Sequence, residues 1–510
     1  MKPNGLAIFN SNDIYPVSAD STLPFAQHRD IFYLSGVDQE ESILLIFPDA
    51  PYENQREILF LKETNEHIAV WEGEKLTKER AFEVSGINNV IWLQDFDKTL
   101  KELMSYADTM YINTNEHYRA TIETETREAR FIKKWKNDYP AHKVEKSNPI
   151  LQRIRSVKES EELDLIQQAC DITEKGFRRI LNFVKPNVME YEIEAEFAHE
   201  FLRNRSKGFA YTPIIASGNN ANVLHYIENN QQCNAGDLIL LDVGAEYANY
   251  SSDMSRTIPV SGKFTERQAA VYNAVLRVKN EATKMLVPGT LWKQYHVEVG
   301  KLMTSELLGL GLMDKADVQN ENPDWPAYKK YFMHGTSHHM GLDTHDYGLL
   351  YEPMQANMVF TVEPGIYLPK EGFGIRLEDD VVIQANGEPF NLMRNIPIEI
   401  DEIDTMFRAT INPIIGQLKE FLQQSGYKLN LFNSLNDANI EIKQLTYESQ
   451  IKINKSLAIE AYTGCISSVF INETNQLKGD KINLRFKRVS NYSKFTSIEA
   501  FILEKADQGL

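Results

Sequence analysis

The stretch HGTSHHMGLDTHD, from His334 to Asp346, concentrates residue types that bind metals and transfer protons. It holds four histidines and two aspartates, in a chain with 11 histidines among 510 residues. Imidazole can ligate a metal ion or act as a general acid or base near neutral pH. The clustering therefore predicts a chemical site, with one histidine as a ligand and others left for proton transfer or substrate contacts.

Two further stretches place pairs of carboxylates at matching positions. LILLDVGAEYANYSSDMSRTIPV and MVFTVEPGIYLPKEGFGIRLEDDVVI each read as a β-hairpin, with β-rich runs on either side of a polar turn. Asp242 and Asp253 are symmetric about Tyr247 and Ala248 in the first stretch. Glu363 and Glu378 are symmetric about Lys370 and Glu371 in the second. Turns centred there would set each pair directly across the hairpin, with Cβ atoms roughly 5 Å apart.

Four ionised carboxylates that converge on one site are strongly disfavoured unless they are protonated or neutralised. Two divalent cations would cancel the four negative charges. Carboxylate oxygens with one imidazole suit Mn²⁺, Co²⁺ or Zn²⁺ better than copper. Bridging carboxylates would hold the two ions roughly 3.5–4 Å apart, the two-metal geometry that hydrolytic enzymes use.

The three motifs, in this order and spacing, resemble the creatinase and methionine aminopeptidase superfamily with the pita-bread fold. Within it they are most similar to the Xaa-Pro aminopeptidases (aminopeptidase P). The catalytic resemblance covers about residues 155–404. The first 150 residues resemble the accessory domain of that family, including QHRDIFYLSGVDQEESILLI. The carboxyl-terminal tail is not covered.

The resemblance implies a role for each motif residue. The implied metal ligands are Asp242, Asp253, His338, Glu363 and Glu378. Among the implied catalytic residues, His225 and His345 contact the substrate and stabilise the transition state. His334 lines the pocket, and Glu363 relays a proton to the prolyl nitrogen. Arg376 supports the metal centre. Arg376 lies two residues before Glu378, so in a strand it shares a face with that carboxylate and can orient it. His339 is expected to be a packing residue.

The implied function is that of an Xaa-Pro aminopeptidase. It would hydrolyse the bond between an amino-terminal residue and a proline in second position, with a metal-bridging hydroxide as the nucleophile. The expected cofactors are two divalent ions, Mn²⁺ first and Co²⁺ or Zn²⁺ as alternatives. A prolidase, which acts on Xaa-Pro dipeptides, is the nearest alternative. The five intact ligands argue against a catalytically inactive peptide-binding member and against creatinase, which uses no metal. A methionine aminopeptidase usually lacks so large an amino-terminal domain.

The composition of the chain excludes several classes of binding partner. A net charge of −18 would repel nucleic acid and anionic membrane surfaces. The three cysteines match no disulfide framework or zinc-ligand spacing. No window has the apolar run of a signal peptide or membrane span, so a cytoplasmic protein is expected. The expected partners are peptides with proline at the second position, and the resemblance implies a homodimer or homotetramer.

These residues must be positioned by an α+β fold. We expect an α/β creatinase-like domain over residues 1–150, a pita-bread catalytic domain over residues 151–404 and a β-rich extension over residues 405–510. Ser156 and Glu159 have the spacing of a capping box. An order of two helices followed by strands occurs twice in the catalytic domain, which suggests an internal duplication. The four helices are expected at about 157–183, 190–205, 265–286 and 291–309, and a further helix is expected near 412–424.

Overall fold

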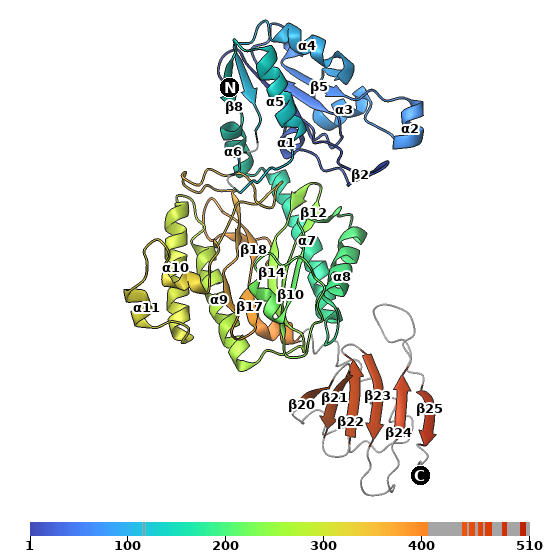
Figure 1. The fold of residues 1–510 in the computed structure, drawn as a ribbon, viewed down its shortest axis with the longest axis vertical. Coiled ribbons are helices and arrows are strands. Elements are labelled where there is room, and N and C mark those ends of the chain that lie inside the picture. Colours follow the sequence, from blue (N-terminus) through green and yellow to red (C-terminus); the bar gives the residue numbers. More distant parts are fainter. Residues whose placement is uncertain are drawn as a thin grey trace. The chain divides into compact units, whose positions relative to one another are not determined.

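A computed structural model describes residues 1–405, apart from 115 and 118, and the backbone of six strands between residues 441 and 505. The chain divides into two compact units (Figure 1). The first comprises residues 1–157 with 347–349, and the second comprises residues 158–346 and 350–510. Among the described residues, no helix combines the length and apolar character needed to cross a membrane.

The first unit is built on a six-stranded mixed sheet in the order β6-β5-β4-β1-β7-β8. Its central strand β1 (Gly5–Asn10) runs antiparallel to β4 (Ile43–Ile46) and parallel to β7 (Thr109–Ile112). The other strands are β5 (Glu57–Leu61), β6 (Val90–Trp92) and β8 (Lys143–Lys146). Every residue of β1 is buried, as expected for a strand with helices on both faces of its sheet.

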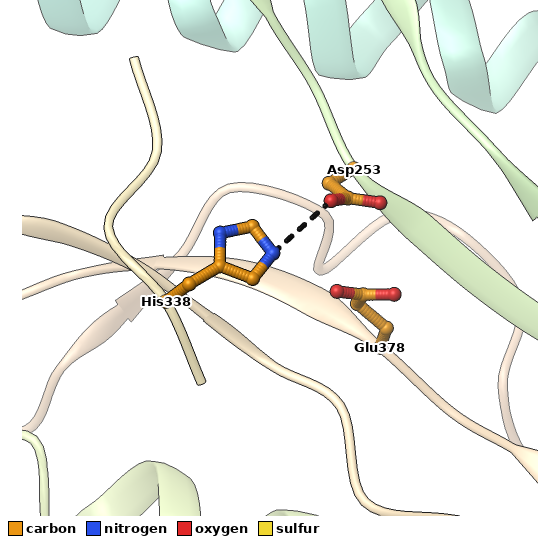
Figure 2. Close-up of side chains that lie close together, drawn as sticks. All are labelled: Asp253, His338 and Glu378. Atoms are coloured by element: carbon orange, nitrogen blue, oxygen red, sulfur yellow. Dashed lines mark ion pairs between the residues drawn. The ribbon is translucent and has the colours of Figure 1, made fainter. Parts of the chain in front are cut away.

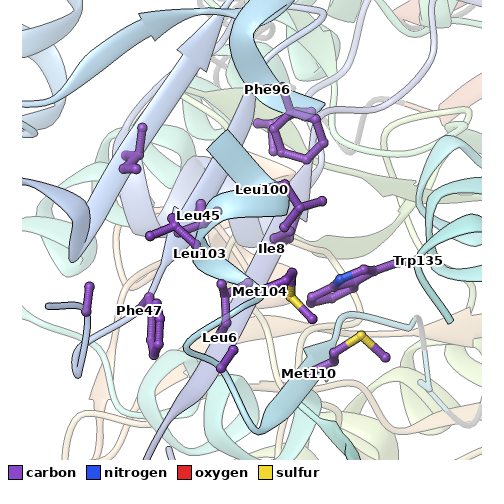
Figure 3. Close-up of a cluster of buried hydrophobic side chains, with 14 of the residues drawn as sticks. Leu6, Ile8, Leu45, Phe47, Phe96, Leu100, Leu103, Met104, Met110 and Trp135 are labelled. Atoms are coloured by element: carbon purple, nitrogen blue, oxygen red, sulfur yellow. The ribbon is translucent and has the colours of Figure 1, made fainter. Parts of the chain in front are cut away.

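Alternation along β1 assigns its side chains to two cores. Leu6 and Ile8 pack with side chains of α4 (Phe96–Leu103) and with Trp135 of α5 (Arg127–Asp138), as Figure 3 shows. Ala7 and Phe9 belong to a second core, which also takes side chains from α1 (Arg29–Ser35), α3 (Lys78–Ser85) and α6 (Asn148–Ser156). Successive strand residues point to opposite faces, so one strand stabilises both layers.

The second unit contains the four predicted helices close to their predicted bounds. They are α7 (Ser160–Phe183), α8 (Glu190–Arg203), α9 (Glu266–Lys284) and α10 (Trp292–Gly309). The predicted capping box was wrong, because Ser156 is the last residue of α6. Val157 leaves the helix in an extended conformation, and Glu159 becomes the N-cap of α7. The Glu162 side chain accepts a hydrogen bond from the Glu159 backbone N–H at 2.9 Å.

The strands after each helix pair form the sheets that hold the predicted motifs. After α7 and α8 come β10 (Ile214–Ser217), β11 (Leu238–Val243) and β14 (Met254–Pro259), which make one three-stranded sheet. After α9 and α10, β15 (Val359–Val362) pairs with β18 (Asp379–Val382), and β16 (Gly365–Leu368) pairs with β17 (Phe373–Arg376). The order of two helices followed by strands therefore occurs twice, as predicted.

The described part of the tail is an antiparallel sheet with strands in chain order, from β20 to β25. The strands are Glu441–Leu445, Glu448–Ile453, Leu457–Tyr462, Cys465–Ile471, Ile482–Phe486 and Ala500–Lys505. The expected β-rich extension thus contains these six strands among its described residues. The predicted helix near residues 412–424 lies outside the described residues.

Candidate metal centre

The first hairpin has a different register from the predicted one. Asp242 in β11 pairs with Ser255 in β14, so the prediction that it faces Asp253 was wrong. The turn lies at Ala248 and Asn249, one residue later than expected, and both have positive φ, of 49° and 69°. A two-residue hairpin turn of this kind favours asparagine and disfavours a bulky residue such as tyrosine at its centre. Moving the turn by one residue shifts every cross-strand partner by two.

The two aspartates still meet, although diagonally. The pairing on either side places Asp253 opposite Gly244, where a Cβ atom would lie 1.7 Å from the Ser252 carbonyl oxygen, so no side chain fits. The Tyr211 hydroxyl lies 2.6 Å from Oδ1 of Asp242 and 2.6 Å from Oδ1 of Asp253. Burial, followed by the charges of the two aspartates, raises the pKa of Tyr211 well above its usual value. The phenol therefore stays protonated, and its single O–H lies within hydrogen-bonding distance of both carboxylates.

The second hairpin has the predicted register. Val362 pairs with Asp379, and Gly365 pairs with Arg376. Both pairs belong to one continuous alignment, which places Glu363 directly across from Glu378. The turn at its tip includes Gly372, whose φ of 76° suits glycine. The sequence therefore located both this turn and the carboxylate pair correctly.

Three of the predicted ligands form a compact buried group (Figure 2). Asp253, His338 and Glu378 each offer one ligand atom, and these atoms lie within 4.8 Å of one another. His338 Nε2 is 3.4 Å from Asp253 Oδ2. His338 Nδ1 lies 2.9 Å from the His339 carbonyl oxygen, which accepts a hydrogen bond only from a protonated Nδ1. Nε2 is then the nitrogen that faces the carboxylates with a lone pair, as metal ligation requires.

The remaining two predicted ligands adjoin this group. Asp242 is linked to the group by the Tyr211 hydroxyl, which also contacts Asp253. Glu363 Oε1 lies 3.8 Å from His338 Nε2, and Glu363 Oε2 lies 3.6 Å from His334 Nδ1. All five predicted ligands thus belong to one continuous set of contacts.

The charges of this set are poorly balanced by the protein alone. Burial, followed by the neighbouring Asp242 carboxylate, raises the pKa of Asp253 well above its usual range. Burial, followed by the charge of Asp253, does the same to the pKa of Glu378. Burial also raises the pKa of Glu363 to about 7. Divalent cations would offset both the desolvation and the repulsion, so this donor set of carboxylate oxygens and one imidazole fits divalent metal ions.

Arg376 supports the metal centre by a direct contact with Asp242, whereas the sequence predicted a direct contact with Glu378. Its guanidinium donates to Asp242 Oδ2 at 2.6 Å, to the Tyr367 hydroxyl at 2.7 Å and to Ser255 Oγ at 3.0 Å. Ser255 Oγ in turn donates to Glu378 Oε2 at 2.7 Å. Arg376 therefore pairs directly with Asp242 and reaches Glu378 through a hydroxyl group, because the hairpin register puts Ser255 across from Asp242.

The predicted substrate-facing histidines lie in different surroundings. His334 Nε2 is 2.7 Å from the Tyr367 hydroxyl. His345 is exposed, and its ring lies 4.3 Å from the His338 ring at an interplanar angle of 82°. His225 is exposed in a turn after the short helix η3 (Gly218–Asn222), and among the described residues no hydrogen bond or ion pair joins it to the carboxylates. His339 is buried against Trp292 and Phe360, in the packing environment that the sequence predicted.

Sequence reasoning missed the neutral residues that hold the charged groups of the centre: Tyr211 and Ser255 contact carboxylates, and Tyr367 contacts Arg376 and His334. Tyr211, Ser255 and Tyr367 carry no charge, and none of them lies at a position that the charge pattern marks. Ser255 could have been found, because a turn placed at Asn249 makes it the partner of Asp242. His296 of α10 contacts the same region, because its Nδ1 accepts a hydrogen bond from the Thr336 N–H at 3.5 Å, within the loop that carries His338.

Comparisons with known proteins agree with this geometry. Residues 164–385 match the model of metallopeptidase family M24, and residues 1–111 match that of the aminopeptidase P amino-terminal domain. An Xaa-Pro aminopeptidase from Haemophilus influenzae is 33% identical, over 80% of this chain and 94% of its own. Human Xaa-Pro aminopeptidase 3 is 30% identical, over 77% of this chain and 79% of its own.

Solved structures of aminopeptidase P enzymes are also similar to this chain. A putative aminopeptidase P from Bacillus anthracis is 31% identical, covers 80% of this chain and 95% of its own, and has a TM-score of 0.74. The Zn-substituted aminopeptidase P of Escherichia coli, in complex with product, is 29% identical with the same coverage and a TM-score of 0.71. The similarity therefore includes the overall fold as well as the motifs.

Proposed function

The chain belongs to the aminopeptidase P family of M24 metallopeptidases, and we propose that it hydrolyses the bond between the amino-terminal residue of a peptide and a proline in second position. The observation that carries this proposal is the buried group of Asp253, His338 and Glu378, with Glu363 beside it and Asp242 linked to it through the Tyr211 hydroxyl. The match of residues 1–111 to the aminopeptidase P amino-terminal domain favours an aminopeptidase over a prolidase.

We assign metal binding to the five predicted ligands, and we propose two divalent ions, with Mn²⁺ as the natural metal. The ligands are Asp242, Asp253, His338, Glu363 and Glu378. When bound there, two divalent ions would polarise the scissile carbonyl and lower the pKa of water. Hard carboxylate oxygens favour Mn²⁺ over softer ions.

Glu363 is the carboxylate that we assign to proton transfer. Its side chain is 19% exposed, compared with 7% for the Asp253 side chain. A general acid must reach the group that it protonates, and here that group is the prolyl nitrogen of the departing peptide. His334 lies beside Glu363 and is fixed by Tyr367, so it would line the pocket at this point.

His345 and His225 are the side chains that we assign to the substrate. His345 is exposed and lies against His338, so it can reach a peptide bound at the metal centre. His225 is exposed too, and its assignment rests on the family motif that it occupies. Both would donate to the developing negative charge of the transition state.

A prolidase would need a basic group to bind the carboxylate of its dipeptide. Arg376, the basic side chain within the centre, is 3% exposed. Its guanidinium already contacts Asp242, Tyr367 and Ser255. It therefore cannot bind a dipeptide carboxylate, and this observation favours longer peptides as substrates.

A panel of peptides tests this proposal. With Mn²⁺ present, Xaa-Pro-Xaa tripeptides should be cleaved at the Xaa-Pro bond with kcat/KM at least about tenfold above that of Xaa-Pro dipeptides, which corresponds to about 1.4 kcal/mol. Peptides with an acetylated amino terminus should not be cleaved, because the free amine has to meet the acidic centre. Faster cleavage of dipeptides would identify a prolidase instead. The homodimer or homotetramer and the cytoplasmic location stay predictions.

A further inference from the structure

Lys158 and Asp346 form an ion pair that is sealed from solvent in the second unit. Each side chain is 1% exposed, and Lys158 Nζ lies 3.0 Å from Asp346 Oδ2. Taking two charges out of water costs much of what their attraction returns, so a buried pair of this kind is a weak source of stability. Removing one partner is nevertheless harmful, because the other charge then stays buried without this attraction. Such a pair is better suited to fixing the positions of its two side chains than to stabilising the fold.

The ion pair packs directly against the backbone of the histidine-rich loop. A Cβ atom added at Gly341 would lie 2.2 Å from Asp346 Oδ2 and 2.8 Å from Lys158 Nζ. Only glycine leaves room for the pair at this point. The Gly341 carbonyl oxygen also accepts a hydrogen bond from the Ser251 N–H at 2.8 Å. The start of the segment 341–346 is therefore clamped between the ion pair and β13 (Tyr250–Ser251).

His345 takes its position from this segment. Residues 341–346 belong to no helix or strand, so regular backbone pairing does not fix them. The Asp346 N–H donates to the His339 carbonyl oxygen at 2.9 Å. The Asp346 side chain lies in the interior, whereas its neighbour His345 is exposed against the His338 ring at 4.3 Å. Fixing Asp346 therefore fixes the backbone from which the adjacent imidazole projects.

We propose that Lys158 is a positioning residue for His345. Its ammonium group holds the Asp346 carboxylate, and through it holds the His345 imidazole at the edge of the metal centre. Lys158 is itself anchored, because its backbone N–H donates to the Asn357 carbonyl oxygen at 2.9 Å, two residues before β15. This inference rests on the proposed function, since it gives His345 a role in the aminopeptidase reaction.

A double-mutant cycle in the full chain tests the inference. Lys158→Met keeps most of the side-chain length and removes the charge. It should lower kcat on an Xaa-Pro-Xaa tripeptide by about 10²-fold, the scale of a displacement of roughly 1 Å in a catalytic group. Bound Mn²⁺ per chain should not change. In a His345→Ala background, the same substitution should lower kcat by less than about threefold, because the side chain through which Lys158 acts is already absent.

Other outcomes would overturn the inference in distinguishable ways. If Lys158→Met lowers kcat by the same factor in both backgrounds, leaves kcat unchanged or releases the metal, Lys158 does not act through His345. If His345→Ala alone keeps full kcat, the proposed role of His345 fails and the inference fails with it. If Lys158→Met does not fold, Asp346→Asn replaces it, because this substitution keeps the shape of the side chain and removes its charge. Its effect on kcat is then compared with and without the His345→Ala substitution.

A control variant removes a cation from an ion pair that joins α7 to α8 and is less buried than the Lys158–Asp346 pair. Arg179 of α7 pairs with Glu196 of α8, with side-chain exposures of 23% and 24%. Arg179→Met should keep kcat within about twofold of the unaltered enzyme, as surface ion pairs contribute little. A comparable loss in this control would show that the effect of Lys158→Met is not specific to the loop.

Discussion

Single hydroxyl groups determine how the carboxylates of the metal centre are held. Tyr211 fixes Oδ1 of Asp253 at 2.6 Å, and Ser255 fixes Oε2 of Glu378 at 2.7 Å. A hydroxyl donor orients a carboxylate without adding charge, so it leaves the negative charge for a metal ion. Reasoning from charged residues found the carboxylates and could not find these donors. The ion pair of Arg376 with Asp242 was likewise hidden, because it depends on a register that differs from the predicted one.

The histidines provide a prediction at the scale of single residues. His345→Ala and His225→Ala should each lower kcat by roughly 10²–10⁴, the range for a positioned acid–base or electrostatic group. Bound metal should not change, because neither side chain belongs to the assigned ligand set. Steady-state kinetics and elemental analysis of the same samples measure both quantities. Loss of metal from either variant would place that histidine among the ligands instead.

At the scale of elements, the two hairpins show what a sequence pattern can and cannot determine. The second was predicted correctly from the symmetry of Glu363 and Glu378, and its turn sequence PKEG has glycine where φ is positive. The first was placed one residue too early, although Asn249 marks a left-handed position better than Tyr247 does. The bounds of the four helices were predicted to within a few residues, whereas the cap of α7 depended on where α6 ends. Local propensity thus predicted the elements, and their exact junctions required the tertiary structure.

The turn of the first hairpin gives a prediction at this scale. Asn249→Val should destabilise the protein by about 1–3 kcal/mol, because a β-branched residue is strained at a φ of 69°. Asn249→Gly should cost less, since glycine adopts positive φ without strain. Urea unfolding of the two variants measures the difference. Equal stability of the valine and glycine variants would mean that this turn does not constrain the hairpin.

At the scale of the whole molecule, the first unit carries a buried acid that makes its stability depend on pH. Burial raises the pKa of Glu128 to about 8 from its ordinary value of 4.5. Its Oε2 accepts hydrogen bonds from the Asn10 N–H and the Asn10 side-chain amide, both at 3.0 Å. Between these two pKa values the folded state holds a proton that the unfolded state has released. The contribution of protonated Glu128 to the free energy of unfolding is therefore fully present below about pH 4.5, and it is lost as the pH rises to about 8.

Glu128→Gln tests this dependence, because glutamine resembles the protonated acid at every pH. The free energy of unfolding of the first unit should fall between pH 5 and 8 in the unaltered protein, by on the order of several kcal/mol. In the variant that part of the decrease should be absent. Hydrogen exchange of the β1 and β7 amides at several pH values reports on this unit. Parallel pH profiles of the two proteins would show that Glu128 is ionised in the folded state.

We propose that two divalent ions, on which peptide hydrolysis depends, are held by Asp242, Asp253, His338, Glu363 and Glu378. Metal content per chain after loading with Mn²⁺ and gentle removal of the excess tests it most directly. We predict two ions per chain, with activity that rises as they bind. Asp253→Ala and Glu378→Ala should each lower the metal content and abolish activity while the circular dichroism spectrum is kept, and Asp164→Ala, at an exposed acid in α7, should change neither. Near-normal turnover by either ligand variant, or by protein without bound metal, would contradict the claim.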